Sequence, residues 1–330
     1  MGTELQRQAN VASALSAADL PQSPINGRVH RLAHLKPGHR GTRALLESVV
    51  RQLETLYRVN EQLQKDNERM HNELEAGARV QRLLVPNEAP EFPGASFAWR
   101  FAPSCELAGD ILDLVQFDDH RVGVYLLDVS GHGTASALLS VTLSRLLSHM
   151  SSDSLLLKTQ NRDEKDSVLA PAEVARCLNE RFPMDPEEPQ YFTLVYGVLD
   201  LERLEFRYVA AGHSGPLVVR DGEDVRRCPS IGVPVGLFPG TTFQEATLEL
   251  QPGDRFYLFS DGVVEAEAPT GETFDIERLT HCLANSRSLP LDDSLDRVLQ
   301  DVERWCGTEG PGDDVSLVAV ELPTDGKSTT

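Results

Sequence analysis

Residues 122–133 of this 330-residue sequence contain an apolar run that ends at an acid: Val122-Gly123-Val124-Tyr125-Leu126-Leu127-Asp128-Val129-Ser130-Gly131-His132-Gly133. Its first six residues are typical of a buried strand. A carboxylate directly after a buried strand is removed from water, so it needs a cation, hydrogen-bond donors or a proton. The glycines beside it allow the backbone to turn sharply and to approach a small ligand. The stretch therefore predicts a strand whose end carries an acid with a specific role.

Three other segments also place an aspartate beside glycine at the end of apolar sequence: Ala108-Gly109-Asp110, Ser260-Asp261-Gly262 and Gly312-Asp313-Asp314. One such acid is usually a turn residue or a helix cap. Four of them, with few lysines or arginines nearby, indicate hard divalent cations such as Mg²⁺ or Mn²⁺, which prefer oxygen ligands. Spacing alone leaves both interpretations open.

Carboxylates shared between two such cations would produce an activated hydroxide and a clamp for phosphate oxygens, which is the chemistry of phosphoester hydrolysis. The sequence contains no G-x-S-x-G motif, no Cys-x5-Arg loop and no G-x-x-x-x-G-K loop. A hydrolase without a nucleophilic side chain agrees with that absence.

Apolar alternation and turn residues predict an α+β fold, with a central antiparallel β-sandwich flanked by α-helices and preceded by a long coiled-coil helix. Grouped strands with paired helices exclude a simple alternating parallel sheet. We expect a turn at Asp221-Gly222. The expected strands lie near 97–101, 122–127, 191–199, 203–210, 216–220, 243–250, 255–260 and 315–322. The expected helices lie near 134–149, 171–181, 275–284 and 292–305.

Before the sandwich, apolar residues recur at steps of three and four, which is the pattern of a coiled coil. The stripe consists of Leu46, Val49, Leu53, Leu56, Asn60, Leu63, Asn67, Met70, Leu74 and Gly77. Asn60 and Asn67 both fall at the first core position, where a buried asparagine favours a parallel two-stranded coil. The stripe over residues 46–77 predicts a parallel homodimer; the alternative is a helix that packs back on its own domain.

The predicted organisation is a flexible N-terminal tail (1–40), a dimerising coiled coil or linker helix (41–80), a catalytic domain (81–323) and a disordered C-terminal tail (324–330). Net charge is −20. Residues 1–85 contain 12 Lys and Arg against 9 Asp and Glu, and the remainder contains 19 against 42. This acidic balance argues against nucleic acid or an anionic membrane as a partner. With no apolar run long enough to span a bilayer and five scattered cysteines, we expect a cytoplasmic protein with reduced thiols.

Taken in order, these acidic segments and four further motifs resemble the SpoIIE-type branch of the PPM (type 2C-like) metal-dependent serine/threonine protein phosphatases. The resemblance covers about residues 80–322. The further motifs are Tyr191-Phe192-Thr193-Leu194-Val195-Tyr196-Gly197, Ala210-Ala211-Gly212-His213-Ser214-Gly215-Pro216, Gly232-Val233-Pro234-Val235-Gly236-Leu237 and Ser260-Asp261-Gly262-Val263-Val264-Glu265-Ala266. Each is weak alone, but their joint order is specific.

This resemblance implies two Mn²⁺ or Mg²⁺ ions and assigns a role to each acid. Asp128 bridges both ions, the Val129 carbonyl binds one, and Asp261 and Asp313 bind the other. Asp110 holds the cluster directly or through water. The implied substrate is a phosphoserine or phosphothreonine on a regulator that is similar to an anti-sigma-factor antagonist.

The sequence departs from the family pattern at Ala108, at Ile111-Leu112 and at Val315-Ser316, and none of these changes removes a ligand. His132 either protonates the leaving oxygen or stabilises a turn. We expect His213 to be structural, Asp113 and Asp314 to support the site or face solvent, and Glu265 to belong to its network. The alternatives are a catalytically silent binding scaffold and a hydrolase of small phosphoesters.

Overall fold

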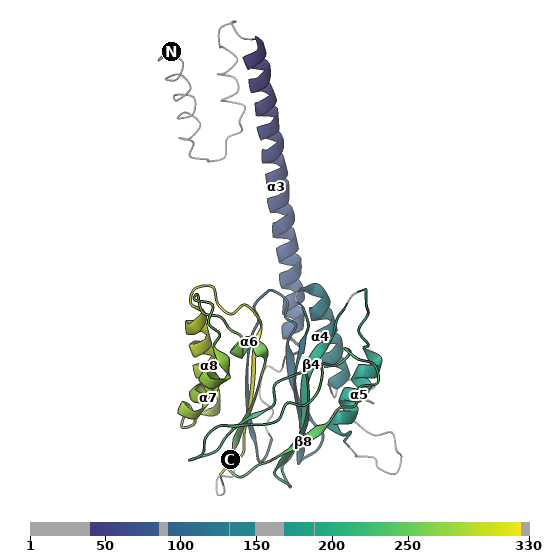
Figure 1. Cartoon of the computed structure of the whole chain (residues 1–330), viewed down its shortest axis with the longest axis vertical. Helices are drawn as coiled ribbons and strands as arrows, with labels where there is room; N and C mark the ends of the chain where they lie inside the picture. The colour runs from purple at the N-terminus through teal and green to yellow at the C-terminus, as the bar shows by residue number, and fades with distance from the viewer. Residues whose placement is uncertain (1–39, 86–91, 132, 149–167, 188, 325–330) are drawn as a thin grey trace. The chain divides into compact units, whose positions relative to one another are not determined.

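The computed structural model describes residues 40–85, 92–131, 133–148, 168–187 and 189–324, with side chains from Ser48 onward (Figure 1). The predicted tails therefore lie almost entirely outside the described residues. The chain divides into two compact units, one ending at His71 and the other beginning at Asn72. None of the helices within the described ranges is both long enough and apolar enough to cross a membrane.

Two five-stranded antiparallel sheets form the second unit. One has the strand order β1-β10-β9-β6-β7 and the other β2-β3-β4-β5-β8. Their bounds are β1 (Ser96–Ala102), β2 (Ile111–Gln116), β3 (Arg121–Val129), β4 (Phe192–Asp200), β5 (Glu205–Ala211), β6 (Leu217–Val219), β7 (Arg226–Arg227), β8 (Glu245–Glu249), β9 (Arg255–Phe259) and β10 (Val315–Glu321). The predicted antiparallel sandwich is confirmed.

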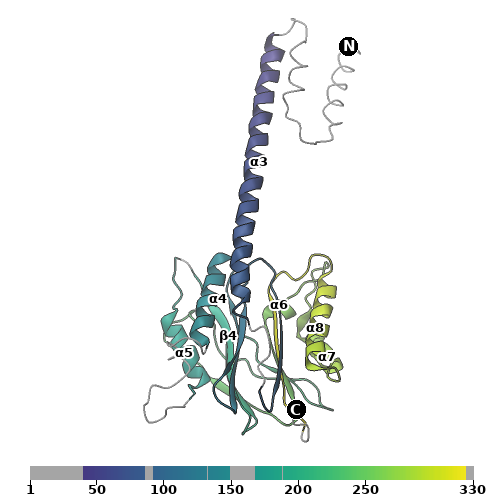
Figure 2. The ribbon, with the colours of Figure 1, turned by 180° about the vertical axis from the view of Figure 1, so that it is seen from behind.

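Helices cover the outer faces of both sheets. The views in Figures 1 and 2 show α4 (Thr134–Leu147) and α5 (Pro171–Arg181) on one side, and α7 (Asp275–Asn285) and α8 (Leu291–Cys306) on the other. A short helix, α6 (Asp261–Val264), follows β9. The four longer helices agree with the predicted ones to within a few residues at each end.

Alternating strand residues divide the apolar side chains among three clusters. The inner cluster lies between the sheets, where Phe206 stacks on Phe256 with ring centroids 4.6 Å apart. The two outer clusters lie under the helix pairs, as when Leu295 and Val298 of α8 pack against the sheet that contains β9 and β10. Burial on both faces explains why β3, β4 and β9 read as nearly continuous apolar runs.

Three elements were not expected from the sequence: the short helix α6 and the strands β2 and β7. β2 begins at Ile111 within a segment that the sequence analysis treated only as part of a motif, and β7 is a two-residue edge strand, Arg226–Arg227. The turn at Asp221-Gly222 is present, because Gly222 has a φ of 76° and Glu223 N–H donates to the carbonyl of Arg220 at 3.2 Å.

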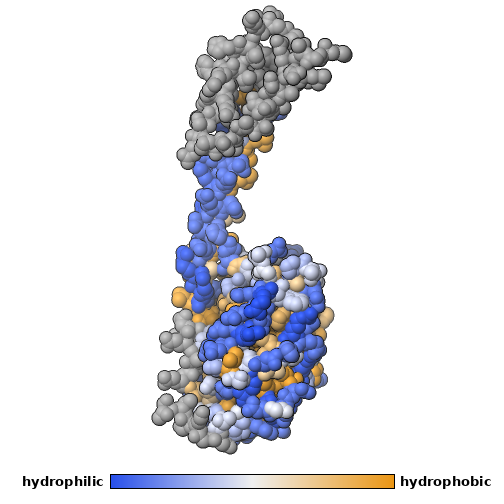
Figure 3. Space-filling model, turned by 90° about the vertical axis from the view of Figure 1, so that its left-hand side faces the viewer, coloured by the Kyte–Doolittle hydropathy of each residue, from blue (hydrophilic) through white to orange (hydrophobic). Residues whose placement is uncertain are grey.

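The long helix α3 (Arg40–Arg82) contains the predicted coiled-coil stripe. Leu56 and Leu63 are 64% and 61% exposed, and Figure 3 shows apolar side chains, in orange, along one side of the helix. The burial changes near the end of α3, where Ala78 and Gln81 are buried within the second unit. The helix is confirmed, whereas the homodimer stays a prediction.

Candidate metal centre

Strand pairing brings Asp110 and Asp128 together. β2 starts directly after Asp110, and β3 ends one residue after Asp128. The two strands are antiparallel, with Ile111 opposite Leu127. The next residue outward on each strand is therefore one of the two aspartates, so both lie at the same edge of this sheet.

The other sheet presents Asp261 and Asp313 in a similar way. Phe259, the last residue of β9, is opposite Leu317 of β10. Asp261 follows the end of β9 and Asp313 precedes the start of β10, so the two acids extend from one edge of that sheet. Both side chains are exposed.

Ser260 fastens these two strand ends to each other. Its hydroxyl donates to the carbonyl of Asp314 at 3.0 Å and accepts from the N–H of Ser316 at 2.9 Å. A Cβ atom at Gly262 would lie only 2.1 Å from the carbonyl oxygen of Asp314. Only glycine allows this approach, which explains the Ser260-Asp261-Gly262 sequence in physical terms.

Asp314 connects the two sheets at this end of the sandwich. Its buried carboxylate accepts hydrogen bonds from the backbone N–H groups of Ser104 and Gly109, both at 2.8 Å, and more weakly from the N–H of Asp110 at 3.4 Å. The bonds hold the loop before β2 against the start of β10. Asp314 is therefore the supporting residue that brings the acids of the two sheets together.

The Val129 carbonyl and the Asp128 carboxylate face the turn at Gly109. A Cβ atom at Gly109 would lie 2.9 Å from the Val129 oxygen and 3.4 Å from Asp128 Oδ1. A side chain at position 109 would therefore crowd both oxygen donors. Glycine leaves the space that a small cation needs at this turn.

Like charges and burial raise the pKa values of the acids. Burial, and then the charge of Asp128, holds the pKa of Asp110 well above its usual range. Burial, and then the charges of Asp261 and Asp313, raises the pKa of Asp128 to about 7. The pKa of Glu265 is also raised, by burial first and then by Asp261 and Asp313. Among the described residues, no basic side chain offsets the burial and mutual repulsion that raise these pKa values.

The donor set suits a hard divalent cation. Asp110 is 2% exposed, and its Oδ2 has no hydrogen-bond partner among the described residues. Carboxylate and carbonyl oxygens are the ligands that Mg²⁺ and Mn²⁺ prefer. Across the described ranges, no three His, Cys, Asp or Glu side chains are already arranged so that they could hold a metal ion. The orphaned oxygen and the crowded acids fit the predicted ions in donor chemistry, without a preformed cage.

Gln81, at the end of α3, makes contacts that were not predicted from the sequence. Its side-chain amide donates to the Ala108 carbonyl at 2.7 Å and accepts from the Ala108 N–H at 3.0 Å. It also donates to the hydroxyl of Ser140 on α4 at 3.1 Å. This places a linker residue against the segment that leads into Gly109 and Asp110, and no local sequence signal marks it.

Three further candidates are His132, His213 and Asp113. His132 lies outside the described residues, so its role stays a prediction. His213 is buried, its Nδ1 lies 3.0 Å from the Ser214 carbonyl, and burial lowers its pKa to about 4, which agrees with a neutral structural residue. Asp113 lies within β2, where burial raises its pKa to about 6.

Comparison with known proteins identifies relatives of this chain. The family model described as Stage II sporulation protein E (SpoIIE) matches residues 118–323. Phosphoserine phosphatase RsbP of Bacillus subtilis (strain 168) is 28% identical over 66% of this chain and 50% of its own length. Phosphoserine phosphatase RsbU of the same organism is 23% identical over 68% of this chain and 63% of its own.

A solved structure shares the fold. The SiaA-PP2C domain of Pseudomonas aeruginosa superposes with a TM-score of 0.65 at 17% identity, over 78% of this chain and 98% of that domain. The chain spans about half the length of RsbP, so the whole-protein properties of that relative do not follow from the match alone.

Proposed function

This chain belongs to the family of the Stage II sporulation protein E, and from that premise we propose that it is a metal-dependent serine/threonine phosphoprotein phosphatase. One observation carries the proposal. Asp110 and Asp128 are brought together at a strand edge, and neither forms an ion pair with a described lysine, arginine or histidine. Acids that burial and mutual repulsion keep from ionising are suited to bind cations.

The proposed ligands for two Mn²⁺ or Mg²⁺ ions are Asp128 for both, the Val129 carbonyl for one, and Asp261 and Asp313 for the other, with Asp110 in direct or water-mediated support. Such ions, when bound, would supply positive charge to phosphate oxygens and lower the pKa of water. The chain contributes the positions of the donors. Asp314 holds the backbone at Gly109, and Ser260 holds the end of β9.

Protons compete with cations for the carboxylate groups of the site. With a raised pKa, the carboxyl group of Asp128 is partly protonated near neutral pH, and it must lose that proton to serve as a ligand. We therefore expect proton release on metal binding and weaker binding as the pH falls below about 7. This direction follows from the charges of the site and does not depend on the substrate.

The proposed substrate is a phosphoserine or phosphothreonine on a regulator protein similar to an anti-sigma-factor antagonist. RsbP and RsbU carry the name phosphoserine phosphatase, which supports this class of substrate. A protein substrate should be hydrolysed with a much higher kcat/KM than free phosphoserine, because contacts remote from the phosphate contribute binding energy.

The coiled coil is proposed to form a parallel homodimer through residues 46–77. Its support is the exposed apolar stripe, in which Leu53, Leu56, Leu63 and Met70 are all about half exposed or more in the single chain. Sedimentation at micromolar concentration should give a dimer. Leu56→Asp with Leu63→Asp should give a monomer, whereas the outward-facing pair Glu61→Gln with Lys65→Gln should not. A wild-type monomer would refute the dimer without touching the phosphatase proposal.

The direct test is hydrolysis of p-nitrophenyl phosphate with and without Mn²⁺, comparing the intact protein with Asp128→Asn. We expect metal-dependent turnover that falls at least about a hundredfold in the variant, because loss of an outer-shell partner alone typically costs about 10–100-fold and Asp128 is proposed as a direct ligand. Asp118→Asn is the matched control, because Asp118 pairs with Arg121 at the other end of the same hairpin. Metal binding without turnover would indicate a switched-off enzyme that needs its partner, whereas no metal binding at all would favour the silent scaffold.

A further inference from the structure

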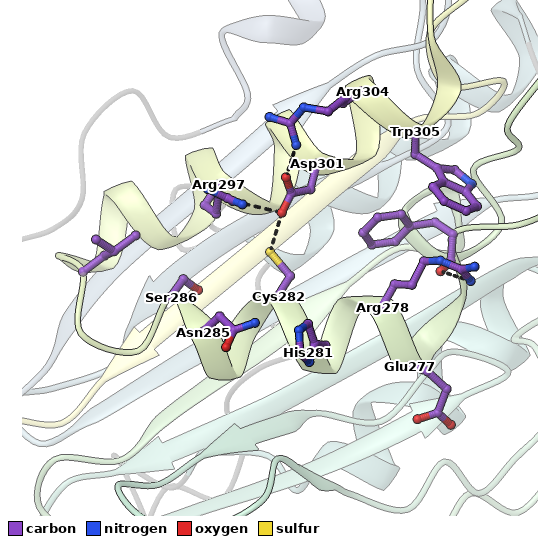
Figure 4. A pocket seen from close by; sticks show the side chains of 12 residues that line it. Glu277, Arg278, His281, Cys282, Asn285, Ser286, Arg297, Asp301, Arg304 and Trp305 are labelled. Atoms are coloured by element: carbon purple, nitrogen blue, oxygen red, sulfur yellow. Dashed lines mark hydrogen bonds and ion pairs between the residues drawn. The ribbon is translucent and has the colours of Figure 1, made fainter.

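A pocket of about 850 Å³ lies between α7 and α8, on the outer side of the sheet that contains β9 and β10 (Figure 4). Phe274, Leu289 and Trp305 give it apolar walls. Its volume falls within the range of about 300–1,000 Å³ that is typical of small-molecule sites. The lining includes none of the five proposed metal ligands, so the pocket is a separate feature.

Two arginines of α8 are fixed at the pocket by one acid. Arg297 Nε donates to Asp301 Oδ2 at 3.0 Å, and Arg304 donates to the other carboxylate oxygen. The Cys282 thiol of α7 also donates to Asp301 Oδ2, at 3.2 Å. The Asp301 side chain is 19% exposed against 56% and 66% for the two arginines, so solvent and ligands meet the guanidinium groups first.

The aromatic end of the pocket is equally well fixed. The guanidinium of Arg278 lies 4.2 Å from the centroid of the Trp305 ring and pairs with Glu272 and Asp275. The Trp305 Nε1–H donates to the carbonyl of Glu272 at 3.0 Å, and the Phe274 ring meets the indole edge-on at 6.1 Å. Little ordering of side chains is needed before a ligand binds, which favours affinity.

The charge of the lining also favours an anion. Arg297 and Arg304 share a single acid, Asp301, which leaves an excess of positive charge at this part of the pocket in a chain whose net charge is −20. Glu277 is itself paired with Arg227 at 2.6 Å, and Asp301 is shared by two arginines. Guanidinium groups have five N–H donors each, so those that bind one carboxylate retain donors for a second anion.

We propose that the α7–α8 pocket binds an organic anion that has an aromatic or apolar body, with its acidic group on Arg297 and Arg304 and its body against Phe274 and Trp305. The geometry in Figure 4 places the arginines of α8 across the pocket from His281 and Asn285 of α7. Cys282 takes no part in covalent chemistry here, because burial raises the pKa of its thiol to about 12 and keeps it protonated.

The test uses 1-anilinonaphthalene-8-sulfonate as the probe on the full chain, read by energy transfer from tryptophan. We expect binding with energy transfer that falls in Trp305→Phe but does not vanish, because Trp99 is retained on β1, which packs against α8. Arg297→Ala with Arg304→Ala should weaken binding at least tenfold, which corresponds to about 1.4 kcal/mol. The matched control is Arg176→Ala with Arg203→Ala, two surface arginines that pair with acids outside the pocket and should change affinity less than twofold.

A second variant keeps the test decisive if the double variant unfolds. His281→Glu places a negative charge in the pocket at an exposed position without removing an ion pair, and it should also weaken binding at least tenfold. Naphthalene-1-sulfonate should compete well, with sulfate and the neutral 1-naphthol each at least tenfold weaker. Unchanged affinity in both pocket variants, or equal competition by either control compound, would overturn the proposal.

Discussion

Asp254 and Asp128 are both acids at the ends of buried strands, yet the charges around them have opposite signs. Asp254 is 1% exposed and receives two hydrogen bonds from Arg220, both at 2.8 Å, and a third from the Gln251 N–H. Asp128 is surrounded by other acids, and its pKa is raised to about 7. The chain neutralises the first acid internally and leaves the second for something else to neutralise.

This difference separates acids that hold the fold from acids that we propose to bind a ligand. Breaking a buried ion pair leaves an unpaired charge, so the folded state loses stability. Removing one of several mutually repelling acids relieves repulsion, so the metal-free folded state gains stability. Substitutions at the two sites should therefore change stability with opposite signs.

The largest expected effect is at the paired acid. Asp254→Ala should lower the free energy of unfolding by about 3–5 kcal/mol, because it leaves the guanidinium of Arg220 without its buried partner. Denaturant unfolding of the metal-free protein measures this. Glu223→Ala is the control. Glu223 is exposed and comes no closer to Arg220 than 3.8 Å, so the loss of this weak ion pair should cost less than about 1 kcal/mol. Equal costs would contradict the contrast.

The next largest effect is the pH dependence of stability that arises from His213, a buried side chain that stays neutral. The pKa of His213 in the folded state is about 4, below the unfolded value of 6.5. The unfolded chain therefore binds a proton more readily between these values, and stability is lost as the pH falls from about 6.5 to about 4, by about 3 kcal/mol. His213→Asn should remove this pH dependence, whereas the exposed His120→Asn should keep it. An acid sensitivity that persists in His213→Asn would show that another group causes it.

The pH dependence of folding stability should have the opposite sign at Asp128 of the acid cluster. The folded-state pKa of Asp128 lies above its unfolded value, so the stability it contributes is present below about pH 4 and is lost as the pH rises through about 7. Asp128→Asn should therefore raise the free energy of unfolding of the metal-free protein at pH 8 by about 1–3 kcal/mol. Thermal unfolding in a chelator tests it. A destabilised variant at pH 8 would place Asp128 with Asp254, as an acid that holds the fold.

The smallest effect is at the contact between the linker and the site. Gln81→Ala leaves the N–H and carbonyl of Ala108 without their partners, which should cost about 1–2 kcal/mol and reduce phosphatase turnover by about tenfold. Gln62→Ala serves as the control, because exposed Gln62 bonds only within α3, to Asp66. Equal turnover in both variants would show that the Ala108 segment does not position Asp110.

Periodicity predicted most of the fold, because buried strands and amphipathic helices impose patterns on the sequence. β2 escaped prediction since its six residues, Ile111–Gln116, include Asp113 and were assigned to a motif. The acids of the candidate site were predicted because each follows or precedes an apolar strand beside glycine. Asp314 was expected only as a supporting residue or a solvent-facing one, and the structure buries it with four hydrogen bonds.

The contacts that no sequence pattern could predict are those between distant segments. Gln81 lies 27 residues from Ala108 and 59 from Ser140, and a glutamine at the end of a coiled coil is ordinarily a solvent-facing residue. The arginines of the α7–α8 pocket look like a solvated helix face in the sequence. Only the packing of α7 against α8 brings Arg278 and Arg297 to one cavity.

The most direct test of the central claim, that divalent cations complete the acid cluster, is calorimetric titration of Mn²⁺ into the metal-free protein in two buffers of different ionisation enthalpy. We predict binding with net proton release at pH 7, because Asp110 and Asp128 both have raised pKa values, and weaker binding at pH 6. Asp128→Asn should abolish binding, while Asp118→Asn should leave it intact. Binding that survives in Asp128→Asn, or that releases no protons, would contradict the account.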